Sequence, residues 1–261
     1  MLIETIKPRS LDESKNLIVP GNYQKTLTFC VEHFIALSKQ ALADHGFFSV
    51  ALSGGSTPKA IFEKLCSSPY KEQMNWSNIQ IFFSDERALP PDDPNSNFYM
   101  AMQAGFSKMP IPTEQIHRME AEVDIEKNAL KYEKTIYRVL GKRPFDLMML
   151  GMGEDGHTAS LFPLTEGLSV TDRLCIANYI PQKKCWRMTL TFSCINQASN
   201  ICIYVLGANK RDMLARVLFQ PSQKTLPIEK VGTPQSKALW IVDEAAAARC
   251  FSKKSTFPVS K

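Results

Sequence analysis

The sequence predicts an α/β fold in which a mainly parallel β-sheet carries helices on both faces. Two observations indicate this fold class: short apolar runs alternate along the chain with segments of helical spacing, and the runs are apolar at nearly every residue. Strands with both faces buried have this continuous apolar character, and they occur in parallel sheets covered by helices. No repeat, low-complexity block or Gly/Ser linker interrupts the chain, so residues 1–261 are expected to form a single domain, with 1–20 as a loose N-terminal segment.

The expected elements follow one another in a strand–helix rhythm. Leu27, Val31 and Phe34 recur at helical spacing, and Gly46 is a suitable C-cap for the helix that they predict. Short apolar runs bounded by turn-forming residues predict the strands. The predicted helices span 23–44, 59–66, 98–105, 123–140 and 209–219, with one more after Asp243, and the predicted strands span 47–52, 79–83, 145–150, 174–180, 187–191, 201–206 and 238–241.

Composition places the chain among ordinary globular proteins. Hydrophobic residues make up 44% and charged residues 22%, close to typical usage, which excludes a disordered chain, a fibre and a disulfide-rich miniprotein. The net charge of +5 is spread along the sequence, and the only basic tail, formed by Lys253, Lys254 and Lys261, is short. Since nucleic-acid binders gather their basic residues on one face or in a run, no nucleic-acid partner is expected.

The cysteines and the apolar runs predict the compartment. Seven scattered cysteines without a CxxC motif suit free thiols in a reducing compartment better than a disulfide framework. The N-terminal residues include acids and lack the apolar core of a signal peptide. The longest apolar runs, such as 145–150 and 201–208, are far shorter than the roughly 20 residues that cross a membrane. The protein is therefore expected to be cytoplasmic, with no membrane partner.

Three polar segments (53–58, 84–97 and 151–163) follow predicted strands, at the sheet edge where parallel sheets bind ligands. In the first, Gly54 and Gly55 let the backbone turn its N–H groups inward as an anion-binding nest. Thr57 is expected to be the N-cap of the next helix, with Pro58 in its first turn. A phosphate would bind at this helix start, although an ordinary capped turn would have the same residues.

The second segment places two acids and an arginine at a strand end, as Asp85, Glu86 and Arg87. An arginine held by neighbouring carboxylates is a fixed donor for phosphate or sugar oxygens. The alternative is a surface ion pair worth less than about 1 kcal/mol. Taken alone, this motif is explained better by the ion pair.

The third segment contains a literal GxGxxG from Gly151 to Gly156, which invites a dinucleotide-binding interpretation. Pro163 cuts short the helix that should follow, and the next apolar run (174–180) ends without the expected ribose-binding acid, so the match is weak. The stronger signal is His157, two residues after Asp155 in a glycine-rich loop. An imidazole with an unperturbed pKa of about 6.5 exchanges protons at neutral pH, so His157 is the candidate acid–base residue.

Other chemistries lack their motifs. The sequence has no HxH, no HExxH and no paired Cys or His at metal-ligand spacing, so no metal is expected. It also lacks the GxSxG elbow of a serine esterase. A proton-transferring histidine beside several phosphate-binding candidates indicates water-mediated or isomerising chemistry on a phosphorylated small molecule.

Together these motifs resemble the 6-phosphogluconolactonase family. GEDGHTASLFP is the most specific of them, whereas SGGST alone would be weak. The glucosamine-6-phosphate deaminases/isomerases are related and share the fold and the DGH loop, so the resemblance implies a Rossmann-like α/β fold of this lactonase type. The matching strings, in the family's order from about residue 47 to residue 248, are SGGSTP, FSDERALPPDDPNSN, IPTEQIHRM, FDLMMLGMGEDGHTASLFP, WRMTLT and ALWIVDEAAA.

The resemblance implies hydrolysis of 6-phospho-D-glucono-1,5-lactone to 6-phosphogluconate in the oxidative pentose phosphate pathway, by a monomer or weak homo-oligomer without cofactor or metal. It implies His157 and Asp155 as the catalytic residues, the histidine as general base for a water molecule and the aspartate as its orienting partner. Asp85 would hold Arg87 or a sugar hydroxyl. One departure is minor, because Met188 stands where the family usually has Val. The residues implied to bind the phosphate or the sugar are Gly54, Gly55, Ser56, Thr57, Asp85, Arg87, Arg187 and Lys210.

Three alternatives are weaker. A deaminase/isomerase resembling the family's relatives would have a glutamate five residues past the histidine and a DEY motif, but this sequence has Phe162 and Arg87 there. A non-catalytic sugar-phosphate sensor would need an attached DNA-binding segment, for which there is no room before residue 47. A nicotinamide oxidoreductase is disfavoured by the weak GxGxxG match.

Overall fold

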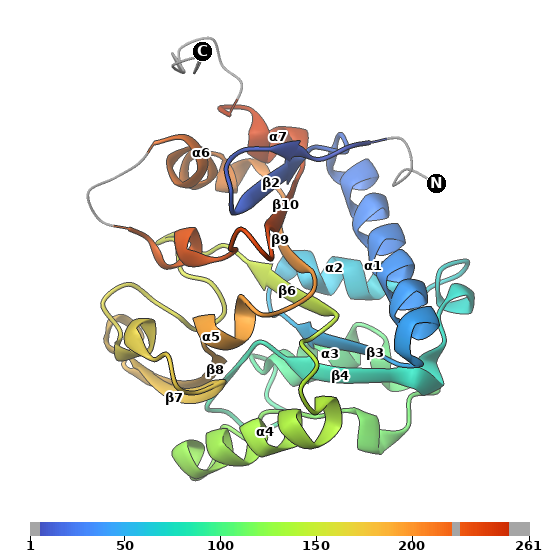
Figure 1. The fold of residues 1–261 in the computed structure, drawn as a ribbon, viewed down its shortest axis with the longest axis vertical. Coiled ribbons are helices and arrows are strands. Elements are labelled where there is room, and N and C mark those ends of the chain that lie inside the picture. The colour runs from blue at the N-terminus through green and yellow to red at the C-terminus, as the bar shows by residue number, and fades with distance from the viewer. Residues whose placement is uncertain (1–5, 221–224, 251–261) are drawn as a thin grey trace.

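The computed structural model describes residues 6–220 and 225–250, and two β-sheets organise this part of the chain (Figure 1). The larger sheet has seven strands in the order β1-β2-β10-β9-β6-β3-β4, and the smaller has three in the order β5-β8-β7. The strands are β1 (Arg9–Ser10), β2 (Lys15–Ile18), β3 (Phe48–Leu52), β4 (Ile79–Phe83), β5 (Asp85–Arg87), β6 (Leu147–Gly151), β7 (Cys175–Ile180), β8 (Cys185–Leu190), β9 (Ile201–Val205) and β10 (Ala238–Val242).

The seven-stranded sheet is parallel except for the short β1, which confirms the predicted mainly parallel sheet. Every residue of β3 and of β9 is buried, as expected for strands covered on both faces. After β3 the chain adds β4 on one side, whereas β6 pairs on the other side of β3. The order of the strands therefore reverses between β3 and β6, and such a switch point is where open α/β sheets bind ligands.

Seven α-helices accompany the sheets in the described residues. Figure 1 shows α1 on one side of β9 and β10, and α5 and α6 on the other side. Helix α4 packs against β7 of the smaller sheet. Asn22 caps the start of α1, and Gly46, at φ 88°, ends it as predicted. The helices are α1 (Tyr23–His45), α2 (Ser56–Leu65), α3 (Asn97–Gln103), α4 (Ile125–Leu140), α5 (Phe192–Ile195), α6 (Arg211–Phe219) and α7 (Glu244–Ala247).

The smaller sheet was not predicted. The apolar runs at 174–180 and 187–191 are not strands of the parallel sheet; as β7 and β8 they form an antiparallel hairpin. The third strand, β5, lies in the segment that was expected to be a polar loop. Arg87 of β5 lies opposite Arg187 of β8, so the pairing brings two cations together at one sheet edge.

The N-terminal segment is also more ordered than predicted. Residues 15–18 form β2, which pairs in parallel with β10, and the side chains of Leu17 and Ile18 are buried in the core. The expectation of a loose segment over 1–20 is therefore wrong for this strand, and residues 1–5 lie outside the described residues.

The state of the cysteines and the character of the helices bear on the sequence expectations. All seven cysteines are free thiols. Within 6–220 and 225–250, no helix has both the length and the apolar character that crossing a membrane requires.

We expect Leu17→Ala to lower the free energy of unfolding by about 2–5 kcal/mol, because it removes a buried side chain without filling the space. Asn16→Ala, on the other face of the same strand and only half-buried, is the matched control and should cost much less. Urea unfolding of both variants measures the difference. Equal stability of Leu17→Ala and the unmodified protein would contradict the packing of β2 as part of the core.

Candidate active site

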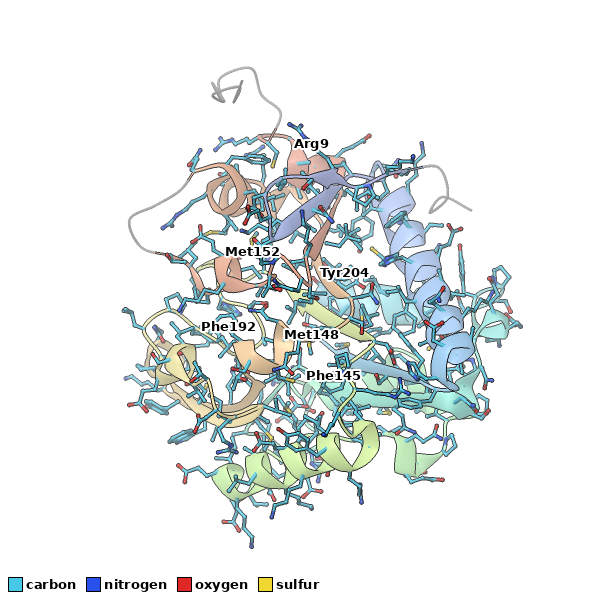
Figure 2. The ribbon with its side chains drawn as sticks, viewed as in Figure 1. Arg9, Phe145, Met148, Met152, Phe192 and Tyr204 are labelled. Atoms are coloured by element: carbon cyan, nitrogen blue, oxygen red, sulfur yellow. The ribbon has the colours of Figure 1, made fainter. Side chains whose placement is uncertain are left out.

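A cavity of about 470 Å³ opens at the switch point between β3 and β6. The loop after β3 and the loop after β6 both line it, and Figure 2 shows the chain passing from Phe145 through Met148 to Met152, where the second loop starts. All three polar segments singled out in the sequence contribute lining residues. The wall of the cavity contains a histidine, two acids and four cations, which are His157, Glu154, Asp155, Arg87, Lys183, Arg187 and Lys210.

The first loop contributes three residues to the wall. Ser53, Gly54 and Gly55 line the cavity, whereas Ser56 and Thr57 do not. Gly55, at φ 105°, is the N-cap of α2 and no side chain caps the helix, so the expectation of Thr57 as N-cap is wrong. The first N–H groups of a helix have no partner within it, and they carry the positive end of the helix dipole. This helix start therefore suits an anion.

Gly54 is required by the packing behind the loop. A Cβ atom at this position would lie 1.9 Å from the side-chain oxygen of Asn97, far inside van der Waals contact. The Asn97 amide in turn donates hydrogen bonds to the backbone carbonyl of Asp85 and to its carboxylate. The glycine loop therefore packs directly on the residues that hold Asp85.

The second loop places a histidine beside an aspartate. Nδ1 of His157 lies 2.5 Å from Oδ1 of Asp155, and the same oxygen accepts a hydrogen bond from the His157 backbone N–H. When Nδ1 carries the proton and donates it to this carboxylate, the lone pair of the ring lies on Nε2. His157 lines the cavity, so the arrangement is that of a general base with an orienting carboxylate.

The surroundings of His157 lower its pKa from the ordinary value of 6.5. Burial is the main cause, because it disfavours the charged form, and the charge of Arg187 acts in the same direction. The hydrogen bond and charge of Asp155 and the charge of Asp85 oppose the shift without cancelling it. His157 is consequently neutral at pH 7 and able to accept a proton.

Gly153 makes room for the histidine ring. A Cβ atom at this position would lie 2.0 Å from Nδ1 of His157, the atom that contacts Asp155. Gly156 has φ 77°, a conformation that side chains disfavour. Two glycines of the GxGxxG string are thus explained by the geometry of this loop, with no nucleotide involved.

The four cations reach the cavity from different parts of the chain. Arg87 donates to the backbone carbonyl of Asn95, and Lys210, in the 3-10 helix η8 (Ala208–Lys210), donates to that of Met152 at 3.0 Å. The Nε atoms of Arg87 and Arg187 are buried without a hydrogen-bond partner among the described residues. An unpaired buried N–H costs free energy. The positive charge of the two guanidinium groups favours an anionic ligand in the cavity that Arg87 and Arg187 line.

Lys183 is a cavity cation that the sequence analysis missed. It ends the 3-10 helix η7 (Pro181–Lys183) in the turn between β7 and β8, and it lines the cavity. The signal in the sequence was the Pro-Gln-Lys-Lys turn between two apolar runs. That turn becomes informative only once the two runs are known to form a hairpin.

Asp85 does not hold Arg87, which corrects the sequence-based assignment. Its carboxylate accepts a hydrogen bond from the Ser160 hydroxyl at 2.6 Å and lies 3.9 Å from Nη1 of Arg187. The side chain is 5% exposed and does not line the cavity. Asp85 acts from behind the wall, on Arg187 and on the loop that follows His157.

Glu86 has a structural role. Its buried carboxylate accepts hydrogen bonds from the backbone N–H groups of Asn97 and Phe98 at the start of α3. Burial raises its pKa, and the N–H groups of Asn97, Phe98 and Arg87 oppose that shift. The three residues of the DER motif therefore have different roles. Asp85 contacts Arg187, Glu86 holds the start of α3, and Arg87 lines the cavity.

The remaining histidines lie elsewhere. A second cavity, of about 580 Å³, lies between α3 and α4 and is lined by His117, but by none of the candidate residues. Burial lowers the pKa of His117 to about 4, with a smaller contribution from the charge of Arg138, and Nε2 is paired with Gln80. Burial likewise lowers the pKa of His33 to about 4. Among the described residues, no group of three or more His, Cys, Asp or Glu side chains is arranged to hold a metal ion.

Comparisons with known proteins find similar proteins over most of the chain. The family described as "Glucosamine-6-phosphate isomerases/6-phosphogluconolactonase" matches residues 22–240. A 6-phosphogluconolactonase of Chlamydia trachomatis is 35% identical over 89% of this chain and 90% of its own length. One of Nostoc sp. is 40% identical, covering 80% of this chain and 87% of its own length. The solved structure of a 6-phosphogluconolactonase from Trypanosoma cruzi superposes with a TM-score of 0.81 at 26% identity, covering 94% of this chain and 99% of that chain.

We expect Asp155→Asn to lower the pKa of His157 further, because the carboxylate's hydrogen bond and charge raise it. The imidazole resonances of the free protein, followed by NMR across a pH titration, measure this pKa. Glu154→Gln removes the neighbouring cavity carboxylate and is the matched control, with a smaller expected effect. A His157 pKa that stays constant or rises in Asp155→Asn would contradict the pairing.

Proposed function

Because the chain belongs to the glucosamine-6-phosphate isomerase/6-phosphogluconolactonase family, we propose that it hydrolyses 6-phospho-D-glucono-1,5-lactone with His157 as general base. Its relatives from Chlamydia trachomatis and Nostoc are named 6-phosphogluconolactonase. The product would be 6-phospho-D-gluconate, as in the oxidative pentose phosphate pathway. The observation that carries the mechanism is the contact between Nδ1 of His157 and Asp155 beside the cavity.

In the proposed first step, Nε2 of neutral His157 accepts a proton from a water molecule while the water oxygen bonds to the lactone carbonyl carbon. The carbonyl electron pair moves onto its oxygen and gives a tetrahedral intermediate. Asp155 keeps Nδ1 protonated and stabilises the imidazolium that forms, as a carboxylate does in a catalytic triad. A positioned base of this kind contributes about 10²–10⁴-fold to the rate.

In the second step, the intermediate collapses and the bond between the carbonyl carbon and the ring oxygen breaks. His157 returns its proton from Nε2 to that oxygen, which becomes the hydroxyl of the open-chain product. One water molecule is consumed and the histidine ends neutral. The new carboxylic acid then loses its proton to solvent.

The cations of the cavity are suited to bind the phosphate group of the proposed substrate. Arg87, Arg187 and Lys210, together with Lys183, provide positive charge around the cavity, and the backbone at Gly54 and Gly55 adds the N-terminus of α2. Phosphate binds well at helix starts and to arginine forks. We propose that these groups hold the phosphate and sugar oxygens while the lactone carbonyl lies at His157. Ser56 and Thr57 do not line the cavity, and in this proposal they contribute as the first residues of α2.

Phe162 argues against a deaminase/isomerase. The related enzymes of that class resemble this chain in the histidine loop but carry a glutamate five residues past the histidine. Here the residue is a buried phenylalanine stacked on the His157 ring. A phenyl ring exchanges no proton, so ring opening of an amino sugar would lack its acid–base group.

We also propose that the reaction needs neither metal nor cofactor, and that the enzyme acts in the cytoplasm as a monomer or weak homo-oligomer without nucleic-acid or membrane partners. The groups used in the mechanism all line one cavity. The lactone is an activated ester, so orientation and a single base suffice to speed its hydrolysis.

The decisive assay adds the purified protein to freshly prepared lactone and follows acid release above the spontaneous rate. Glucosamine 6-phosphate, scored by ammonia, runs in parallel. We expect lactone turnover that a metal chelator leaves unchanged, and no ammonia. Ammonia release without lactone turnover would overturn the proposal in favour of the deaminase reaction.

We expect His157→Ala to lower kcat by about 10²–10⁴-fold with KM nearly unchanged, because the base acts in the transition state. In the unmodified enzyme, kcat/KM should fall as the pH drops through a value below 6.5, since protonated His157 cannot act as base. Steady-state kinetics between pH 4.5 and 9, with folding checked by circular dichroism, measure both. Near-normal kcat in a folded variant would remove the mechanism.

We expect Arg187→Ala to raise KM chiefly, by about tenfold or more, because a phosphate clamp binds the ground state and the transition state alike. Lys183→Met and Lys184→Met form a matched pair in the same turn, of which only Lys183 lines the cavity. KM should rise in the first lysine variant and stay constant in the second. A loss confined to kcat in Arg187→Ala would contradict its assignment to phosphate binding.

A further inference from the structure

Phe162 is buried in an unusual place for a phenylalanine. It is 1% exposed and belongs to the largest fully buried side chains in the described residues. The others in that set pack in the main hydrophobic core, whereas Phe162 lies outside that core. Its ring instead meets the imidazole of His157 and two cations of the cavity. Core packing alone therefore does not explain why this position holds a phenyl ring.

The ring covers one face of the catalytic imidazole. The centroids of Phe162 and His157 are 3.8 Å apart and their planes differ by 14°, so the rings are stacked in contact. The hydrogen bond to Asp155 fixes one atom of the imidazole but leaves the ring free to rock about that atom. A flat neighbour against its face removes this freedom. The two contacts together define the direction of Nε2.

Two cations share the same aromatic ring. The guanidinium of Arg187 lies 5.7 Å from the Phe162 centroid and the ammonium of Lys183 lies 5.9 Å from it, both within cation–π distance. One side chain thus touches the base and the cations that the proposed function assigns to the substrate phosphate. A displacement of this ring would disturb both parts of the site.

We propose that Phe162 is the positioning residue of the site: its stacked ring holds the plane of His157 and keeps water from one face of the base. The inference rests on the proposed function for its kinetic consequence, although not for its effect on the free imidazole. It differs from the roles of Asp155 and Arg187, since Phe162 has no charge and no hydrogen-bonding side-chain atom.

The charged groups around His157 set the expected direction of the effect. Asp155 contacts it in the same loop, Asp85 acts from β5 and Arg187 acts from β8. Lys183 of η7, Lys210 of η8, Arg87 of β5 and Glu154 of the loop line the same cavity. The number of these charges stays the same when Phe162 is replaced by an aliphatic residue. Access of water to the imidazole increases, which favours the charged form.

The test variant is Phe162→Leu, with Phe106→Leu as its matched control. Phe106 is equally buried, at 1%, but contacts Phe62 and Trp76 in the main core, away from the cavity. We expect Phe162→Leu to raise the pKa of His157, because burial is the main cause of its lowering. We expect kcat to fall about tenfold, because a misoriented base loses rate steeply. The control should alter only stability.

Imidazole NMR titration of the free protein gives the pKa without substrate. The chain has four histidines, and His33 and His117, with pKa values of about 4, stay neutral above about pH 5. The His157 signal is identified by its loss in His157→Gln. If Phe162→Leu does not fold, Phe162→Met removes the ring while filling more of its volume.

The outcomes separate the two proposals. Absence of lactone turnover in the unmodified protein would overturn the proposed function, while the titration would still test Phe162. A folded Phe162 variant with an unchanged or lowered His157 pKa would overturn the positioning role, whatever the activity. A raised pKa with a fall in kcat of about tenfold and KM changed less than about threefold supports it. Equal effects in Phe106→Leu would reduce Phe162 to a packing residue and overturn the inference.

Discussion

The buried carboxylate of Asp85 is the interaction on which the site depends. A charge taken out of water must be compensated by hydrogen bonds and opposite charge, or folding pays a large penalty. Here the compensation comes from three separate segments: the Ser160 hydroxyl after the histidine loop, the Asn97 amide at the start of α3, and Arg187 on β8. Satisfying one anion therefore fixes the relative positions of the histidine loop, the glycine loop that packs on Asn97, and the cation-bearing hairpin.

Much of the candidate site could be predicted because its elements are local in sequence. Ser53, Gly54 and Gly55 directly follow one predicted strand, and the loop from Gly151 to His157 directly follows another. Glycine-rich loops at strand ends indicate a ligand site through their backbone chemistry alone. The contact of Asp155 with His157 spans two residues and needs no tertiary information. Gly46 could be recognised as a C-cap for the same reason.

The rest depended on pairing between distant segments. The apolar runs of β7 and β8 look the same in sequence whether the strands join a parallel sheet or form a hairpin, and only the hairpin brings Lys183 to the cavity. The partner of Asp85 was misjudged because Arg87 is two residues away in sequence, whereas Arg187 is a hundred residues further on. Residues two apart on a strand share a face, and so do residues directly opposite across a pair, so Arg87 and Arg187 both lie on the face of Asp85. The pairing of β5 with β8 therefore decides whether a second arginine competes for this carboxylate. The residues next to Asp85 in the sequence do not indicate how β5 pairs with β8.

Two opposing electrostatic requirements of the cavity explain the two aspartates near His157. Cations that hold a phosphorylated substrate also disfavour protonation of a nearby imidazole, and a base whose pKa falls too far no longer takes a proton from water. Arg187 acts on His157 in this direction, and burial adds to it. Asp155, in the same loop as His157, and Asp85, on β5, oppose both effects. In the proposed mechanism the two aspartates are thus needed because the cations are there: Asp155 stabilises the transient imidazolium, and Asp85 offsets the charge of the arginine that it holds.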